Sequence, residues 1–216
     1  LLPTDCRRVL DAGCGPGKIA LGLVDDAEHV DAVDFSEAMI RIGRAATSTD
    51  RIRWQCSPIE TAELDPPYGM ITTGASLHWM DWDTVLPRFA RVLPSGALVI
   101  VEGDAPSQAP WRAGRKELIK RYSTNRDYQP YDLVDELRRR GLFTVTDELI
   151  TNPAPHTQSI DEFLLSEHSR ESLSLDSMTA ADAAAFDDQM RELLAAHAED
   201  GQITYGVTTR IVWGRP

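Results

Sequence analysis

Hydrophobic and polar positions follow two different patterns along the first hundred residues. Short aliphatic runs bounded by turn residues predict five buried strands, at about 7–13, 30–36, 51–57, 68–76 and 96–103. Between these runs, apolar residues at helical spacing predict helices at about 18–27, 37–46 and 82–93. Strands that alternate with helices indicate parallel βαβ units with right-handed crossovers, and therefore an α/β fold built on a doubly wound sheet.

The second half of the chain has a different pattern. The predicted helices lie at about 111–123, 131–141 and 179–200, and the predicted strands at about 142–151 and 202–214. Ser159 and Glu162 have the spacing of a capping box, in which each residue satisfies a backbone N–H of the other's segment. This spacing predicts one more helix, which begins just after Ser159.

Composition and charge narrow the class of protein. The 216 residues are 42% hydrophobic and 26% charged, which is typical of a chain that buries its own core. The formal net charge of −12 opposes nucleic-acid binding, because that binding depends on Lys and Arg displacing counterions from phosphates. No apolar run has the length of a transmembrane helix or a signal peptide. We therefore expect a small-molecule partner, no nucleic acid, no membrane and a cytoplasmic location, with no signal for the oligomeric state.

The cysteines indicate neither a metal site nor a disulfide framework. Cys6, Cys14 and Cys56 form no pair or His/Cys cluster with metal-ligand spacing. We expect no metal and a reduced setting. The chain starts without methionine and enters its first predicted strand within a few residues, which suggests a further N-terminal segment in the full protein.

The stretch "VLDAGCGPGK" places three alternating glycines directly after the first predicted strand. At a strand-to-helix junction, unpaired backbone N–H groups and glycines let a ligand approach the main chain closely. Gly13, Gly15 and Gly17 do not fit a dinucleotide fingerprint, because Lys18 stands where the third glycine belongs. They do not fit a phosphate-binding P-loop either, since Ile19 occupies the hydroxyl position.

The pattern Asp-x-Gly-x-Gly-x-Gly that begins at Asp11 resembles motif I of the class I S-adenosylmethionine-dependent methyltransferases. Asp34 strengthens the resemblance, because it ends the second predicted strand 21 residues beyond Gly13. The resemblance covers about residues 7–104. It implies a Rossmann-like, mostly parallel sheet of seven strands with helices on both faces and an antiparallel C-terminal strand.

The same resemblance implies a division of the chain and a set of cofactor contacts. Residues 1–104 are expected to form the S-adenosylmethionine-binding half, and 105–216 the remainder of the same domain, with helical cover and substrate elements at about 105–141 and 157–200. In this family the loop after the first strand receives the methionyl part of the cofactor, and an acid at the end of the second strand binds the ribose. The implied contacts are Asp11, Gly13 and Gly15 for the methionine portion, Asp34 for the ribose, and Phe35 or Met39 beside the adenine. Ser57 and the backbone of Ile59 are expected at the adenine edge, and Ser76 is a further expected cofactor contact.

The stretch "GASLHWMDW" after the fourth predicted strand resembles the trans-aconitate methyltransferase-like (methyltransferase type 11) branch of small-molecule methyltransferases, which also carries a His-Trp pair. The resemblance places His78 and Trp79 where the methyl group meets the acceptor. His78 is then a candidate base for a hydroxyl acceptor or a positioning donor for a carboxylate, and a packed histidine is the open alternative. His168 is a weaker candidate that we expect at the surface.

A competing motif, "DPPY" at Asp65–Tyr68, matches the tetrapeptide with which methyltransferases of nucleic-acid bases hold a target amine. In those enzymes it follows the fourth strand, whereas here it precedes that strand. We therefore expect it at the other end of the sheet, where the two prolines break the chain.

These observations predict S-adenosylmethionine-dependent methyl transfer to a small molecule, at the oxygen of a carboxylate or a hydroxyl. A cofactor-binding scaffold or sensor of the same fold remains the alternative, because fold does not determine function. A nicotinamide-dependent dehydrogenase is disfavoured by the glycine spacing. The acceptor has no recognisable signature in the sequence.

Overall fold

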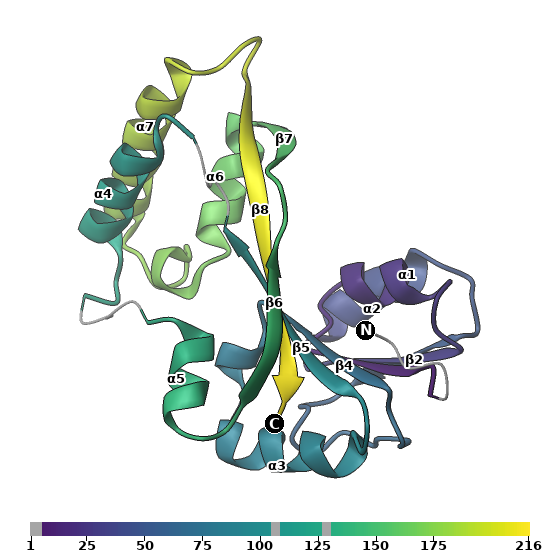
Figure 1. Ribbon diagram of the computed structural model, residues 1–216. Helices are drawn as coiled ribbons and strands as arrows, with labels where there is room; N and C mark the ends of the chain where they lie inside the picture. The colour runs from purple at the N-terminus through teal and green to yellow at the C-terminus, as the bar shows by residue number, and fades with distance from the viewer. Residues whose placement is uncertain (1–5, 105–108, 127–130) are drawn as a thin grey trace. The chain divides into compact units, whose positions relative to one another are not determined.

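The computed structural model describes residues 6–104, 109–126 and 131–216 (Figure 1). The chain divides into two compact units. We call the first the core unit; it comprises the described residues of 1–103, 131–150 and 209–216. The second, the helical unit, comprises the described residues of 104–130 and 151–208.

The core unit contains a mostly parallel sheet. Its five parallel strands are β1 (Arg8–Ala12), β2 (His29–Asp34), β3 (Ile52–Cys56), β4 (Met70–Gly74) and β5 (Ala97–Asp104). The strand order is β3-β2-β1-β4-β5-β8-β6, so β1 lies between β2 and β4. The chain order reverses at this point, and α/β sheets bind ligands at such a switch point, outside the carboxyl ends of the strands.

Two antiparallel strands complete this sheet. β6 (Thr144–Ile150) pairs only with β8 (Gln202–Arg215) among the described strands, from Thr144 against Arg215 to Ile150 against Arg210. β8 is long enough to run through both units, because its residues from 209 onward belong to the core unit. The antiparallel C-terminal strand implied by the sequence is therefore confirmed.

Helices pack on both faces of the sheet, as expected. The helices of the core unit are α1 (Lys18–Leu23), α2 (Glu37–Ala45), the short 3-10 helix η1 (Leu77–Trp79), α3 (Trp82–Val92) and α5 (Leu133–Arg139). Successive strand residues point to opposite faces, so Val9 belongs to one buried cluster and Leu10 to another. The Val9 cluster includes Ala20 of α1 and Ile40 of α2, whereas the Leu10 cluster includes Phe89 of α3.

The helical unit has its own hydrophobic core. Its elements are α4 (Arg112–Tyr122), β7 (Ala154–Ser159), α6 (Ile160–His168), the 3-10 helix η2 (Glu171–Leu173), α7 (Ala180–Ala195) and the first part of β8. Phe163, Phe186 and Met190 are buried in this core together with Trp111. The predicted capping box is present, since the Ser159 hydroxyl accepts from the Glu162 amide and the Glu162 carboxylate accepts from the Ser159 amide.

Two features differ from the sequence expectation. The sheet has eight strands rather than seven, because β7 pairs antiparallel with the start of β8. β7 consists of polar, mostly exposed residues, so it carries no apolar alternation that could have predicted it. Helix α5 groups with the core unit rather than with the cover segment expected at about 105–141, because Leu133, Val134 and Leu137 pack into the Leu10 cluster.

Candidate active site

The glycine loop between β1 and α1 is anchored to the end of β2. The carbonyl oxygen of Val33 accepts hydrogen bonds from the amides of Gly13 (2.8 Å) and Cys14 (3.0 Å). Gly13, Gly15 and Gly17 all have positive φ angles, of 67°, 54° and 83°. Side chains with a Cβ rarely adopt this left-handed backbone, so the three alternating glycines are explained by the shape of the turn.

Gly13 is also required by a close neighbour in the turn between β4 and η1. A Cβ at position 13 would lie 2.5 Å from the Cβ of Ser76, which is closer than two such atoms can approach. The hydroxyl of Ser76 donates to the carbonyl oxygen of Ala12 at 2.8 Å. Ser76 therefore lies at the carboxyl edge of the sheet, against the loop.

Asp34 connects the end of β2 to the same loop. One carboxylate oxygen accepts from the amide of Gly15 at 2.8 Å, and the other accepts from the amide of Ser36 at 2.8 Å. A Cβ at Gly15 would have no other atom within 4 Å, so the surface beside Gly15 is open. The loop and the acid that the sequence singled out thus form one connected structure.

Asp11 lies beneath the loop and is 1% exposed. Its two oxygens accept from the Thr72 hydroxyl (2.8 Å) and from the amide of Ala20 in α1 (3.1 Å). Burial raises the pKa of Asp11 to about 6, and the charge of Asp34 adds to this shift while the two hydrogen bonds oppose it. Among the described residues no cation pairs with Asp11. Burial also raises the pKa of the Cys14 thiol, which keeps that group protonated.

The residues expected beside the adenine differ in how far their side chains are exposed. Phe35 and Met39 are 74% and 39% exposed, at the start of α2 next to Asp34. Ser57 is half-buried, and its amide donates to the Asp34 carbonyl oxygen at 2.9 Å. The side chain of Ile59 is buried in the Leu10 cluster, so only its backbone could contact a ligand, as the sequence expectation states.

His78 lies in η1, two residues beyond Ser76, and its ring is exposed. Its ring centroid is 4.9 Å from that of Trp79, which is 63% exposed. Within the described parts of the chain, no side chain or carbonyl forms a hydrogen bond with the His78 ring. Partial desolvation lowers the pKa of His78, so the ring is neutral at neutral pH. The alternative of a packed, hydrogen-bonded histidine is not what this geometry shows.

The expectation that His168 lies at the surface is wrong. The His168 side chain is only 8% exposed, and both of its ring nitrogens have partners within the helical unit. The helical spacing of "SEHSR" could not reveal these contacts, because the partners come from η2 and α7.

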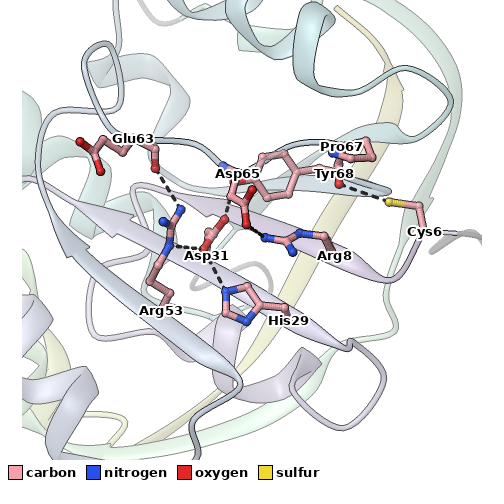
Figure 2. Close-up of polar contacts among 9 residues, drawn as sticks. All are labelled: Cys6, Arg8, His29, Asp31, Arg53, Glu63, Asp65, Pro67 and Tyr68. Atoms are coloured by element: carbon pink, nitrogen blue, oxygen red, sulfur yellow. Dashed lines mark hydrogen bonds and ion pairs between the residues drawn. The ribbon is translucent and has the colours of Figure 1, made fainter.

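The DPPY segment lies at the amino-terminal edge of the parallel strands, where Asp31 forms the centre of a polar cluster (Figure 2). The buried Asp31 carboxylate accepts from the Tyr68 hydroxyl, from Arg53 Nε (2.7 Å) and from His29 Nε2 (3.2 Å). The Tyr68 hydroxyl in turn accepts from the amide of Asp65 at 2.9 Å. Tyr68 is fully buried, so DPPY serves the fold at this edge rather than holding an amine.

Sequence reasoning missed a second charged group, at the carboxyl end of β5. Arg210 donates to Asp132 (2.7 Å) and to Glu148 (2.9 Å), and it lies 3.7 Å from Glu102. Burial and the charge of Asp132 raise the pKa of Glu102, although Arg210 opposes this. No sequence signal could assemble these residues, because they come from β5, the N-cap of α5, β6 and β8.

No group of three or more His, Cys, Asp or Glu residues in the described ranges could hold a metal ion. Of the helices the structure describes, none combines the length and the apolar character needed to cross a membrane.

Comparisons with known proteins agree with this geometry. Residues 9–96 match the family model described as "Methyltransferase domain". An uncharacterized methyltransferase of Mycobacterium bovis is 34% identical over 110 residues, which cover 50% of this chain and 56% of that protein. A malonyl-[acyl-carrier protein] O-methyltransferase of Bacillus cereus is 32% identical over 76 residues, which cover 34% of this chain and 28% of that protein. The chain thus matches only about half, or less, of the length of these relatives.

A solved structure extends the likeness to the whole fold. The structure of a putative type II methyltransferase from Anaeromyxobacter dehalogenans aligns with a TM-score of 0.65 and 23% identity, covering 96% of this chain and 89% of that one. The fold is therefore that of the Rossmann-like methyltransferases. More particularly, residues 9–96 match the family of methyltransferase domains, which agrees with the resemblance based on motif I.

Proposed function

We propose that this chain transfers the methyl group of S-adenosylmethionine to an oxygen atom of a small molecule, either a carboxylate or a hydroxyl. The observation that carries the proposal is the hydrogen bond between Asp34 and the Gly15 amide, beside a loop surface that no side chain covers. The similarity to a malonyl-[acyl-carrier protein] O-methyltransferase favours oxygen as the acceptor atom.

The residues around the loop fit such a cofactor. Each Asp34 oxygen accepts one backbone amide, and a carboxylate oxygen can accept two hydrogen bonds, so both oxygens can also accept from ribose hydroxyls. The open surface at Gly15 suits the methionyl part, above the buried Asp11. The exposed side chains of Phe35 and Met39 offer apolar contact to the adenine.

The chemistry that the cofactor supplies when bound is a methyl group activated by a positively charged sulfur. The protein then has to align the acceptor with that methyl group and exclude water. A carboxylate acceptor is already ionised at neutral pH and needs no base. For a hydroxyl acceptor, the neutral His78 ring can take the proton at a ring nitrogen, because its lowered pKa leaves that nitrogen free.

The alternative is a protein of the same fold that binds the cofactor without transferring its methyl group. Binding and transfer can be separated with S-adenosylmethionine labelled in its methyl group, incubated with a panel of small carboxylic acids and phenols. Transfer to any member supports the proposal. Binding of S-adenosylhomocysteine without transfer to any member supports the scaffold or sensor, and the absence of binding contradicts both readings.

A further inference from the structure

We propose that His168 is a pH-sensitive latch of the helical unit, which hydrogen-bonds the C-terminal end of α6 to both η2 and α7 only while its imidazole ring is doubly protonated. The latch concerns the helical unit alone and does not depend on the proposed methyl transfer.

Both nitrogens of the His168 ring have partners. His168 Nδ1 lies 2.7 Å from the carbonyl oxygen of Leu173, and Nε2 lies 2.8 Å from a carboxylate oxygen of Asp187. Carbonyl and carboxylate oxygens accept hydrogen bonds and cannot donate them. A neutral imidazole has one N–H and one bare nitrogen, so in either tautomer one of these contacts would set a lone pair against an oxygen. Only the imidazolium form satisfies both partners.

The surroundings of the ring favour the same form. The His168 side chain is 8% exposed, and its ring packs edge-on against Phe186 of α7, with 5.6 Å between centroids. Burial alone would lower the pKa of His168, but the hydrogen bonds to Leu173 and Asp187 and the charges of Asp187 and Glu167 outweigh it and raise the pKa.

The other charged groups nearby are largely occupied with one another. Glu167, the neighbour of His168 in α6, binds Arg115 of α4 at 2.7 Å and lies 3.7 Å from Arg170. Asp187 forms its ion pair with His168. Asp187 is therefore the carboxylate whose charge is directly available to the ring from the facing helix.

The consequence is a definite direction of pH dependence. A histidine whose pKa is raised by folding stabilises the folded state fully below its unfolded pKa, and this stabilisation is lost as the pH rises through the folded pKa. The latch should therefore be closed in mildly acidic solution and should open towards alkaline pH. On opening, the His168 ring loses one of its two hydrogen bonds, either to Leu173 of η2, five residues along the chain, or to Asp187 of α7, nineteen residues along.

The test uses the whole chain and follows its histidines by nuclear magnetic resonance. We expect both ring nitrogens of His168 to be protonated at neutral pH, and its pKa to exceed that of an unperturbed histidine. His197, an exposed histidine in the same unit, provides the control variant. Asp187→Asn should lower the pKa of His168. Amide protection in α6 and α7, corrected for intrinsic exchange, should fall as the pH rises through the pKa of His168 in the wild type and in the control His197→Gln, but not in His168→Gln.

Two results would overturn the proposal. One is a neutral His168 ring at neutral pH, with a pKa at or below that of an unperturbed histidine. The other is the same pH-dependent loss of protection in His168→Gln as in the wild type. If His168→Gln fails to fold, the pKa values in the wild type and in Asp187→Asn still decide the question.

Discussion

The carboxylate of Asp34, at the end of β2, accepts a hydrogen bond from the backbone amide of Gly15 at 2.8 Å. Its second oxygen accepts from the amide of Ser36, so Asp34 shapes both the glycine loop and the start of α2. Asp34→Ala leaves two backbone amides without these acceptors, and we expect the unliganded protein to lose about 1–3 kcal/mol of unfolding free energy. Urea denaturation measures this loss. An unchanged midpoint would show that the amides find other partners at no cost.

Gly13 and Gly15 provide a matched pair for the loop. Both have positive φ, so an alanine at either position costs about 1–2 kcal/mol for the left-handed backbone. Only Gly13→Ala also brings a Cβ to 2.5 Å from the Cβ of Ser76. We expect Gly13→Ala to be the more destabilising of the two in thermal unfolding.

The clash itself can be relieved. In the double variant Gly13→Ala with Ser76→Gly, the opposing Cβ is absent, and the extra cost over Gly15→Ala should largely disappear. Equal stabilities of the two single variants would contradict the close contact, as would the failure of Ser76→Gly to restore any stability.

The buried Asp11 should give stability a characteristic pH dependence. The folded protein holds its proton up to about pH 6, whereas the pKa of an unperturbed Asp is 3.8. Between these values the folded state binds more protons than the unfolded chain, so stability falls as the pH rises, by about 3 kcal/mol in total. Asp11→Asn has no such proton to lose, and its amide can pair with both Thr72 and Ala20.

Chemical denaturation from about pH 4 to 8 measures the unfolding free energy of both proteins. The unfolding free energy of Asp11→Asn should increase relative to that of the wild type up to about pH 6, and the difference should then stay constant. The exposed Asp50→Asn serves as the control and should follow the wild type throughout. Parallel curves for Asp11→Asn and the wild type over the whole range would contradict the raised pKa.

The contacts around Asp31 predict that substitutions at Tyr68 and Asp65 lower the unfolding free energy by different amounts. Tyr68→Phe removes a donor from the buried Asp31 carboxylate and the acceptor of the Asp65 amide, which should cost about 1–3 kcal/mol. Asp65→Asn weakens only the solvent-exposed ion pair with Arg8 and should cost less than about 1 kcal/mol. Urea denaturation of both variants checks the ranking, and the reverse order would refute the account of DPPY as a structural segment.

The fold and the loop could be predicted from sequence because their causes are local. Strand runs, helical spacing and the glycines between β1 and α1 all act within about twenty residues, as does the step from Gly13 to Asp34. The contacts that were missed act over longer separations. Thr72 reaches Asp11 across 61 residues, and Asp187 reaches His168 from another helix. The hydrophobic periodicity of the sequence cannot predict such contacts, since they depend on how the elements pack.

Secondary-structure boundaries show the same distinction. The spacing of Ser159 and Glu162 predicted the start of α6, because a capping box acts within one helical turn. β7 was not predicted, because its polar residues form a strand only through pairing with β8. α5 joined the core unit because its buried face matches the Leu10 cluster, which the sequence of α5 alone does not specify.

The effect of replacing His78 should depend on whether the acceptor is a hydroxyl or a carboxylate. If the acceptor is a hydroxyl, His78→Gln should lower kcat by about 100-fold or more, because a general base contributes about that much, with the affinity for S-adenosylhomocysteine unchanged. If the acceptor is a carboxylate, the loss should be small. The exposed His197→Gln is the matched control. An equal loss of kcat in both variants would contradict a role of His78 in proton transfer.

The most direct test of the central claim is calorimetric titration of S-adenosylhomocysteine into the wild type, Asp34→Ala and the control Asp50→Ala at neutral pH. Because hydrogen bonds to a charged group contribute about 1.5–3 kcal/mol, the account predicts that Asp34→Ala weakens binding by at least about tenfold. Asp50 is exposed in the same unit, and its replacement should leave the affinity unchanged. Equal affinities of Asp34→Ala and the wild type would contradict the claim that Asp34 and the glycine loop form the cofactor site.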